Sequence, residues 1–518
     1  MQNRFLSIIL IMIWMVSHLG HAQNKAPNII YILADDMGYG DVSAYNPEGK
    51  IMTPALDQLA AEGMKFTDAH TSSSVCTPTR YGILTGRYNW RSRLKSGVLT
   101  GKSKALIPND RTTVASLLKK QGYQTAFIGK WHLGWDWAQI DPENDQGEGW
   151  NENDFDNIDF TKPIQNGPMD LGFDYSYGHS GSLDMAPYVY VENGKATAQP
   201  DRVTVDQGKY SWWRKGPTAS DFEHVDVSPN FFRRSIEFVK QSAKSEQPFF
   251  LYLALPSPHT PILPPAEWKG KSNLNVYADF IMMIDNWIGK LMTELDTNGL
   301  AENTLLIFTT DNGCSPAAGF NEMVSAGHLP NYIYRGHKAD IFEGGHRVPF
   351  IVKWPKKIKR GSSSDALICT TDLMATVADI TGYELLDDEG EDSFSMLPVL
   401  TGEEQDSRIS LVNHSINGSF AMRQGKWKLI MAPDSGGWSY PVPNKDKEEI
   451  AKLPDVQLYD LETDPGEENN LQDRYPDKVN QLKSHLTELI LNGRSTKGAN
   501  QSNDPTEKEW KQIRFISQ

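Results

Sequence analysis

Four apolar runs, each followed by polar residues, constrain the fold of this chain most strongly. They span residues 27–34, 124–129, 248–255 and 303–310 and are rich in aliphatic and aromatic residues. Runs this continuous indicate strands that are covered on both faces, as in a parallel sheet. Helical patterns alternate with them, so the sequence predicts an α/β fold with a large, doubly wound, mostly parallel sheet flanked by helices.

Helix boundaries are marked by capping residues. Residues 53–63 begin with a Thr cap and a Pro in the first turn and end at Gly63, which predicts a helix. Further helices are expected at 112–120, 231–242, 275–295 and 372–380. Residues 136–229 are rich in Gly, Asn, Asp and Trp without sustained periodicity, so we expect long loops over the strand ends there.

The C-terminal part has a different pattern. From about residue 393 the chain shows hairpin-like pieces at 419–423 and 426–430 and an amphipathic helix near 477–491. At 518 residues the chain exceeds one ordinary core. We therefore expect a large domain at 25–390 and a smaller α+β domain with an antiparallel sheet at 391–518, which ends in a polar tail.

The first 22 residues have the features of a secretory signal peptide. Arg4 precedes an apolar run at 5–16, and small residues end at Ala22. The segment is short for a membrane span, although an uncleaved anchor is the alternative. No other stretch is long and apolar enough to span, so we expect no stable membrane insertion. The protein is expected to be exported, periplasmic or secreted, and the short signal with few cysteines is typical of bacteria.

Charge and cysteine content exclude some functions. The net charge of −15 repels polyanions at long range, so nucleic acid is not expected as a partner, and an anionic substrate requires a local basic pocket. The three cysteines, Cys76, Cys314 and Cys369, are too few for a disulfide scaffold. Their odd number indicates one special thiol, for which Cys76 is the candidate.

The segment around Cys76 has features that suit the binding of an anion. In residues 72–86, SSSVCTPTRYGILTG, Pro78 fits the first turn of a helix, and the preceding Ser/Thr run offers N-cap oxygens. Cys76 is then expected at the helix N-terminus, where unpaired N–H groups favour an anion. Arg80 follows on the same face, with forked donors that suit a tetrahedral oxyanion. The alternative is a capped helix with a small buried Cys.

Polar residues follow all four predicted strands, and the carboxyl ends of parallel strands converge on one crevice. Hard oxygen ligands in such a group suit Ca²⁺ better than zinc, with Mg²⁺ the less suitable choice. For any one group alone a cap or a turn is the favoured interpretation, but four groups together favour a site. The residues are Asp35, Asp36, Lys130, His132, His259, Asp311 and Asn312.

Three segments resemble signatures of the type I sulfatases, within the alkaline-phosphatase-like superfamily. CTPTR followed by YGILTG, from Cys76 to Gly86, resembles the C-x-P-x-R signature whose Cys is oxidised to formylglycine. GYQTAFIGKWH at 122–132 resembles the G-Y-x-T-x-x-x-G-K-x-H segment. RGHKADIFEGGHRVP at 335–349 resembles R-G-x-K followed by E-G-G-x-R-V-P, in which Glu343 and Arg347 are expected to brace the turn.

The resemblance implies a sulfuric ester hydrolase with Ca²⁺ and formylglycine as cofactors. Asp35, Asp36, Asp311 and Asn312 would bind the calcium together with the modified Cys76. The formylglycine hydrate would attack sulfur, deprotonated by Asp311, and His132 would later accept a proton as sulfate leaves. A formylglycine-generating maturation enzyme is the implied partner.

The same resemblance assigns the residues that hold the sulfate group. Arg80, Lys130 and Lys338 would bind the sulfate oxygens, and His259 would protonate the departing alcohol.

A sulfated saccharide is the expected substrate. Residues 172–194 resemble loops of galactose and N-acetylgalactosamine sulfatases, and His179, Arg335 and His337 are the expected substrate contacts. One alternative is a phosphonate or phosphate ester hydrolase of the same superfamily. The other is a glycan-binding protein whose Cys76 is never matured and which has no catalysis.

Overall fold

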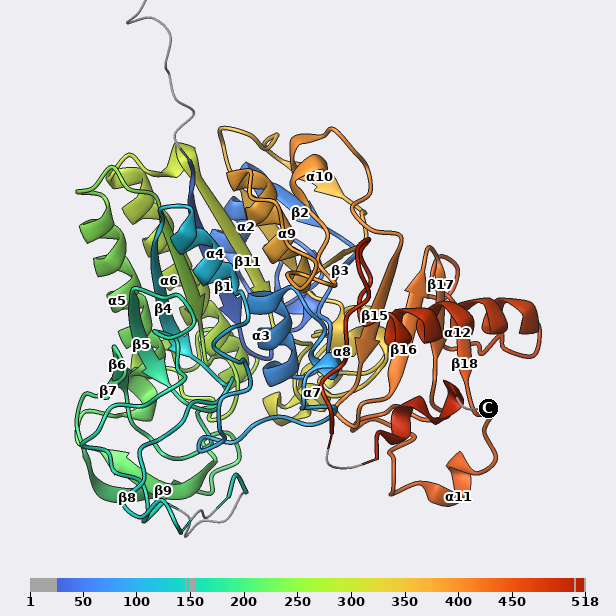
Figure 1. Cartoon of the computed structure of the whole chain (residues 1–518), viewed down its shortest axis with the longest axis horizontal. Coiled ribbons are helices and arrows are strands. Elements are labelled where there is room, and N and C mark those ends of the chain that lie inside the picture. Colours follow the sequence, from blue (N-terminus) through green and yellow to red (C-terminus); the bar gives the residue numbers. More distant parts are fainter. Residues whose placement is uncertain (1–25, 145–146, 150–154, 507–508, 517–518) are drawn as a thin grey trace, which may run out of the picture.

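A large mixed sheet forms the centre of the computed structural model, which describes residues 26–144, 147–149, 155–506 and 509–516 (Figure 1). The predicted signal peptide, residues 1–22, lies outside the described residues. The strands of the sheet are β1 (Asn28–Ala34), β2 (Met64–Phe66), β4 (Gln124–Lys130), β5 (Tyr175–His179), β6 (Val191–Glu192), β7 (Lys195–Ala196), β10 (Phe249–Ala254), β11 (Thr304–Thr310), β12 (Phe350–Lys353) and β13 (Ser362–Ser364). Their order is β13-β2-β12-β11-β1-β10-β4-β5-β6-β7.

Five neighbouring strands in the middle of this sheet are parallel. They are β11, β1, β10, β4 and β5. The four predicted apolar runs form four of these five, and their side chains are almost all buried. This confirms the predicted doubly wound sheet, while β12 and β2 add antiparallel pairing at one side.

Alternation along the strands explains the helix layers on both faces. Ile30 and Ile32 of β1 pack in the core beneath α2 (Pro54–Glu62), α5 (Val227–Ser242) and α6 (Val276–Thr297). Ile29 and Tyr31 point to the opposite core, because successive side chains of a strand face opposite sides. That second core is covered by α3 (Cys76–Thr85), α4 (Val114–Lys120) and α9 (Leu373–Thr381).

The prediction of loops throughout residues 136–229 is wrong in part. Strand β5 lies there, and it pairs in parallel with β4 so that His179 is opposite Lys130. A hairpin of β8 (Pro200–Asp206) and β9 (Trp213–Ala219) follows, and α5 begins at Val227, earlier than expected. The sequence of β5, YSYGH, has no apolar run that would have predicted a strand. Its backbone hydrogen bonds to β4 stabilise it instead.

A separate antiparallel sheet of four strands forms the C-terminal part, as predicted (Figure 1). Leu482 and Leu486 of α12 (Pro476–Leu491) are buried in its core. The strands are β15 (Ser410–His414), β16 (Phe420–Gln424), β17 (Trp427–Ile430) and β18 (Gln457–Asp460). The domain boundary near residue 390 stays a prediction.

The remaining elements are short. No helix among the described residues is both long and apolar enough to cross a membrane. The short elements are β3 (Ala69–His70), β14 (Ile368–Cys369), α7 (Phe320–Ser325), α8 (Glu343–His346), α10 (Leu397–Thr401) and α11 (Lys447–Ile450).

Replacement of Gly129 should disturb the sheet beside Lys130. Gly129 has φ +134°, and an added Cβ would lie 1.8 Å from the carbonyl oxygen of Ala254 on β10. Gly122 is the matched control, because its φ is also positive, at +83°, but no described atom lies within 4 Å of the added Cβ. We expect Gly122→Ala to cost about 1 kcal/mol of unfolding free energy and Gly129→Ala clearly more, as measured by denaturant unfolding. Equal losses would contradict this account.

Candidate active site

The Cys76 segment enters the site as the start of a helix. Helix α3 begins at Cys76 itself, and Pro78 lies in its first turn, as predicted. The predicted Ser/Thr cap is wrong, because the N-cap is Val75 and no side chain caps the helix. The preceding serines are held instead in an extended segment, where Ser74 N donates to His414 O (3.1 Å) and Ser72 O accepts from His414 N (3.1 Å).

The predicted oxygen ligands converge because β1 and β11 are parallel neighbours. Ala34 pairs with Thr310, so the residues that follow each strand lie side by side. Asp36 N donates to Asp311 Oδ1 (3.2 Å), and Asn312 Nδ2 donates to Asp36 Oδ1 (2.7 Å). Asp35, Asp36, Asp311 and Asn312 are all buried. The strand-end argument from the sequence is therefore confirmed for these four residues.

Three buried cations face the three carboxylates. Lys130 Nζ lies 2.5 Å from Asp35 Oδ2, and Lys338 Nζ lies 2.8 Å from Asp36 Oδ1. Arg80 Nη2 bridges Asp35 (3.3 Å) and Asp311 (2.8 Å), and its Nη1 donates to Lys130 O (2.9 Å). Three positive side chains thus face three carboxylates, and the guanidinium group of Arg80 binds two of these carboxylates.

Burial and neighbouring charges shift the pKa values in this group. Burial raises the pKa of Asp35, but Lys130, His259 and Arg80 outweigh it and hold that pKa well below its usual range. Burial and the nearby Asp35 raise the pKa of Asp311 to about 7. Burial also raises the pKa of the Cys76 thiol, although Lys130 and Lys338 oppose the shift. An unmodified Cys76 is therefore a weak nucleophile, since reactivity requires the thiolate.

His132 is oriented to accept a proton. Its Nε2 lies 2.8 Å from Leu99 O, and since a carbonyl only accepts, Nε2 carries the hydrogen and Nδ1 has the lone pair. That Nδ1 atom is buried without a hydrogen-bond partner in the described part of the chain. Burial and Lys130 lower the pKa of His132 well below its usual value, which keeps the ring neutral.

His259 lies at the opposite side of the carboxylates. Its Nε2 lies 3.7 Å from Asp36 Oδ2, while Nδ1 is engaged with Thr260 O (2.5 Å). Burial and Lys338 lower the pKa of His259. Nε2 also lies 3.4 Å from Ser182 Oγ, so both ring nitrogens have polar neighbours.

Sequence reasoning missed Ser182. Its Oγ lies 3.1 Å from Lys130 Nζ and 3.3 Å from His259 Nδ1, so it bridges two predicted catalytic side chains. Ser182 follows β5, the strand that the sequence analysis did not find. Ser182 lies three residues after the carboxyl end of β5. Recognition of that strand would have identified it as a polar residue at the same edge of the sheet as the other site residues.

The three predicted substrate contacts lie around this group. His179 is buried at the end of β5, with its ring stacked on Phe231 at 5.8 Å between centroids. Arg335 donates to Glu467 O (2.8 Å), and His337 Nδ1 lies 3.2 Å from Asp340 Oδ2. Their contact with substrate stays a prediction.

The residues that form this site match a known family across most of the chain. The Sulfatase family model matches residues 27–383. The chain belongs to the sulfatase family. A second model, described as N-sulphoglucosamine sulphohydrolase, C-terminal, matches residues 337–494. This sulfatase is a sulfuric ester hydrolase, and its family and fold confirm the expectation drawn from the three signatures.

Relatives of the sulfatase cover nearly its full length. An N-acetylgalactosamine-6-O-sulfatase of Bacteroides thetaiotaomicron is 33% identical and matches 90% of this chain and 93% of its own. Human arylsulfatase A is 31% identical over 87% of this chain and 84% of its own.

Solved structures give the same result. One from work on the metabolism of multiple glycosaminoglycans by B. thetaiotaomicron has a TM-score of 0.77 at 32% identity, covering 90% of this chain and 99% of that one. A sulfatase from Pseudoalteromonas sp., with a TM-score of 0.68 at 23% identity and coverage of 93% and 94%, shows the fold alone.

The predicted ligand oxygens fit a hard divalent cation. Among the described residues, Asp35 Oδ1 and Asn312 Oδ1 are buried without a hydrogen-bond partner. Ligand atoms of Asp35, Asp36 and His259 lie within 4.8 Å of one another. Unpaired buried oxygens in such a group match the oxygen-rich coordination of Ca²⁺.

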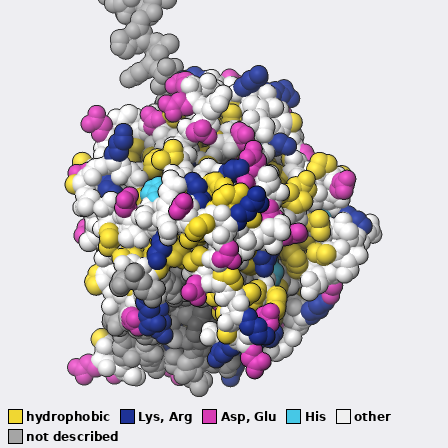
Figure 2. All heavy atoms as spheres, turned by 90° about the vertical axis from the view of Figure 1, so that its right-hand side faces the viewer, with side chains coloured by type: hydrophobic (Ala, Val, Ile, Leu, Met, Phe, Trp, Pro, Cys, Tyr) yellow, Lys and Arg dark blue, Asp and Glu magenta, His cyan; other side chains and the backbone are white. Residues whose placement is uncertain are grey.

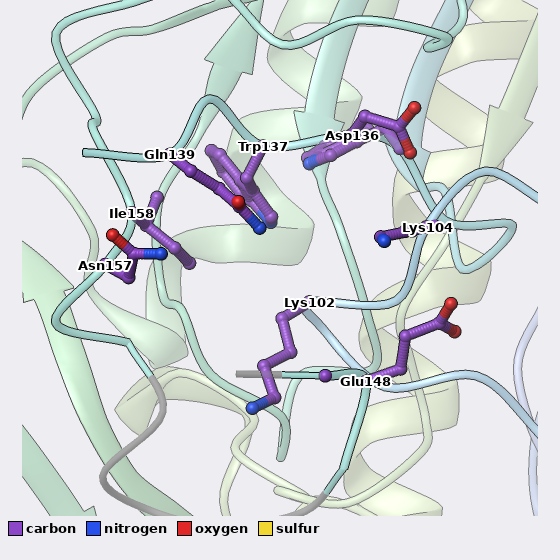
Figure 3. Close-up of a pocket in the computed structure, with 10 residues that line it drawn as sticks. Lys102, Lys104, Asp136, Trp137, Gln139, Glu148, Asn157 and Ile158 are labelled. Carbon is purple, nitrogen blue, oxygen red and sulfur yellow. The ribbon is translucent and has the colours of Figure 1, made fainter. Parts of the chain in front are cut away.

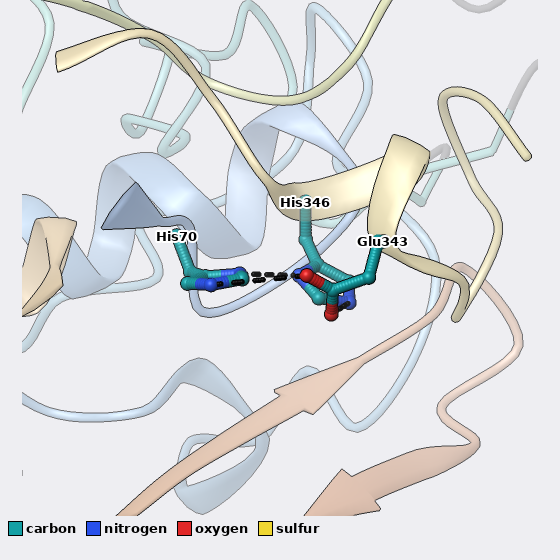
Figure 4. Close-up of side chains that lie close together, drawn as sticks. All are labelled: His70, Glu343 and His346. Carbon is teal, nitrogen blue, oxygen red and sulfur yellow. Dashed lines mark hydrogen bonds and ion pairs between the residues drawn. The ribbon is translucent and has the colours of Figure 1, made fainter. Parts of the chain in front are cut away.

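A second cluster of possible metal ligands, His70, Glu343 and His346, is already neutralised (Figure 4). The two Nδ1 atoms of its histidines lie 3.0 Å apart. Lys428 Nζ lies 3.1 Å from Glu343 Oε1, 3.0 Å from His346 Nε2 and 2.8 Å from Glu467 Oε1. Arg347 also binds Glu343, at 3.1 Å, as the expected brace of this turn. The cluster therefore joins β17 to α8 without needing a metal.

A pocket beside the site is too small for a sugar (Figure 3). Its cavity is about 60 Å³, and Lys102, Asp136, Trp137 and Glu148 are among its lining residues. Ligand pockets usually measure about 300–1,000 Å³. None of the predicted catalytic residues lines this pocket, so we do not assign the substrate to it.

Removal of the Ser182 hydroxyl should slow catalysis. Ser182→Ala removes the bridge between Lys130 and His259, and we expect kcat/KM for a sulfate ester to fall about tenfold, the equivalent of one hydrogen bond to a charged group. Ser180→Ala is the matched control, because the Ser180 hydroxyl is buried in the same loop and has no partner among the described residues. Similar activity of both variants would contradict the role of Ser182.

Removal of Lys428 should destabilise the fold. Lys428→Met leaves Glu343 and Glu467 buried without this counter-charge, which we expect to cost about 3–5 kcal/mol. Lys426→Met is the control, because Lys426 pairs with Asp460 while its side chain is 43% exposed, and solvent screening makes such surface pairs weak. Denaturant unfolding of the two variants measures the difference, and equal losses would contradict a buried role for Lys428.

Proposed function

We propose that this sulfatase hydrolyses sulfate esters of a glycan that contains galactose or N-acetylgalactosamine residues. The observation that carries the proposal is the buried group of three carboxylates and three cations beside Cys76 at the start of α3. Relatives named N-acetylgalactosamine-6-O-sulfatase and N-acetylgalactosamine-6-sulfatase, at 33% and 27% identity, support the sugar class.

The proposal includes conversion of Cys76 to formylglycine by a maturation enzyme. The CTPTR sequence and the family membership support it. Formylglycine supplies a hydrated aldehyde, whose oxygen can attack sulfur and whose second hydroxyl allows sulfate to leave. The interactions of Cys76 with Lys130, Lys338, Asp35 and Asp311 put that chemistry beside both acids and cations.

A calcium ion is the proposed second cofactor, held by Asp35, Asp36, Asp311, Asn312 and the modified residue 76. When bound, it supplies positive charge that draws in and polarises the sulfate group. Without it the six charged side chains sum to zero, so a divalent ion makes this site net positive. That local charge offsets the overall repulsion expected from a net charge of −15.

The side chains of this protein divide the remaining tasks. Arg80, Lys130 and Lys338 are the proposed sulfate contacts, and Arg80 also binds Asp35 and Asp311 through its several donors. His259 would give a proton from Nε2 to the departing alcohol from its doubly protonated form, because Thr260 O already accepts the hydrogen on Nδ1. His132 would accept a proton at its unpartnered Nδ1, and Asp311 would accept the proton of the nucleophile.

The distribution of charge on the outer surface is consistent with attraction of an anionic substrate by the buried site alone. On the face with the C-terminal sheet and α12, acidic and basic side chains are interspersed (Figure 2). No broad basic surface is visible on that face. We also propose export of the protein, supported by the signal-like pattern of residues 1–22.

Mass analysis and a sulfate-release assay test this proposal together. We expect the tryptic peptide 66–80 from the native host to contain formylglycine, and expect defined galactose and N-acetylgalactosamine sulfates to release sulfate. Chelation should abolish release, and Ca²⁺ should restore it. Cys76→Ala should be inactive, whereas Cys369→Ala, a buried cysteine on β14, should retain activity.

Several results would overturn the proposal. An intact Cys76 thiol in active protein would show that formylglycine is not the nucleophile. Faster hydrolysis of an aryl phosphate than of the matched aryl sulfate would favour the phosphate ester alternative. Full activity in chelator would exclude the metal.

A further inference from the structure

Two exposed aromatic side chains stand on one loop of the C-terminal part. The loop, residues 433–441, lies between β17 and α11 and carries Trp438 and Tyr440, which are 44% and 62% exposed. Large exposed aromatics close together commonly mark a binding surface. Their flat apolar faces and polar edges suit sugar rings.

The loop is fixed to the segment that carries Lys338. Asp340 is fully buried, and its Oδ1 accepts hydrogen bonds from Trp438 N (2.7 Å) and Ser439 N (3.0 Å). Its Oδ2 accepts from His337 N (2.9 Å). An added Cβ at Gly437 would lie 2.4 Å from Ala339 O. The aromatic loop and the catalytic segment therefore pack as one unit.

The segment that carries Lys338 is also hydrogen-bonded to the segment that precedes Cys76. Ala339 N donates to Ser74 O (2.8 Å), two residues before Cys76, and Lys338 Nζ reaches Asp36. Cys76, Lys130 and Lys338 are buried, whereas Trp438 and Tyr440 are exposed. The loop is therefore bound through its backbone to the segment that carries Lys338, and its two aromatic side chains remain exposed.

A pocket of about 330 Å³ is lined by Tyr440, and Trp438 lies two residues before it, outside the lining of the pocket. This volume is within the range that accommodates small ligands. Arg335 lines it together with two acidic residues, Glu449 and Asp473. The excess of acidic side chains disfavours a second sulfate or a carboxylate, and it favours the hydroxyl or acetamido groups of an uncharged sugar.

We propose that Trp438 and Tyr440 form a subsite for an uncharged sugar residue next to the sulfated one. The subsite stacks the ring against the exposed aromatic faces while the sulfate is held in the buried group. This inference rests on the proposed function, since it requires a sulfated glycan as substrate. It adds a specificity-determining surface supplied by the C-terminal part of the chain.

Steady-state kinetics on two substrates test the subsite. The probes are N-acetylgalactosamine 6-sulfate and an oligosaccharide with that residue followed by uncharged sugars. We expect Trp438→Ala to raise KM for the oligosaccharide about tenfold more than for the monosaccharide, a ratio equivalent to about 1.4 kcal/mol of lost binding. Trp438→Phe should recover most of this difference, because the aromatic face remains.

Tyr475→Ala is the matched control. Tyr475 is a 37% exposed aromatic residue next to α12, with its ring against Trp427, and its removal should leave the ratio of KM values unchanged. Equal effects of Trp438→Ala on both substrates, or none on either, would overturn the subsite. If the wild-type enzyme released no sulfate from either sugar, the proposed function would fail instead, which separates the two conclusions.

Discussion

The pairing of buried charge at the carboxyl ends of β1 and β11 is the constraint on which the site depends. Asp35, Asp36 and Asp311 are buried side by side, and isolated buried carboxylates are costly. Lys130, Arg80 and Lys338 satisfy them from β4, α3 and the segment before α8. These charges can pair only when the sheet, α3 and that segment are all in place. The site is therefore complete only when the sheet, α3 and that segment are packed together.

A second buried network links the C-terminal sheet to the catalytic segment. Lys428 of β17 binds Glu343 of α8, and Arg423 of β16 binds Asp68 at 2.9 Å. His346 O accepts a hydrogen bond from Thr71 N (2.8 Å), in the segment that leads to Cys76. The small sheet is thus linked by buried contacts to the segment that leads to Cys76. The proposed Trp438 subsite would give the same part of the chain a second role, in substrate recognition.

Much of the candidate site follows from local patterns. Apolar runs identified β1, β4, β10 and β11, and the parallel arrangement brought their polar ends together as expected. The Cys76 helix was found from Pro78. Its cap was wrong because the preceding serines pair with the backbone of His414, a partner more than 300 residues away that no local pattern reveals.

Ser182 was missed for a related reason. The strand that precedes it, β5, has no continuous apolar run and is recognised only from its parallel pairing with β4. The hairpin of β8 and β9 was missed as well, since its strands alternate between partly buried and exposed positions rather than forming a core run.

The sequence by itself determined four strands of the central sheet, β1, β4, β10 and β11, the polar residues at their ends and the family signatures, because each is encoded by neighbours within about ten positions. Only the tertiary structure decided which charges pair, how Ser182 joins Lys130 to His259, and that Trp438 stands beside the Lys338 segment. Those contacts join residues from 50 to more than 300 positions apart. They depend on the geometry of burial and on charge balance, which no local pattern records.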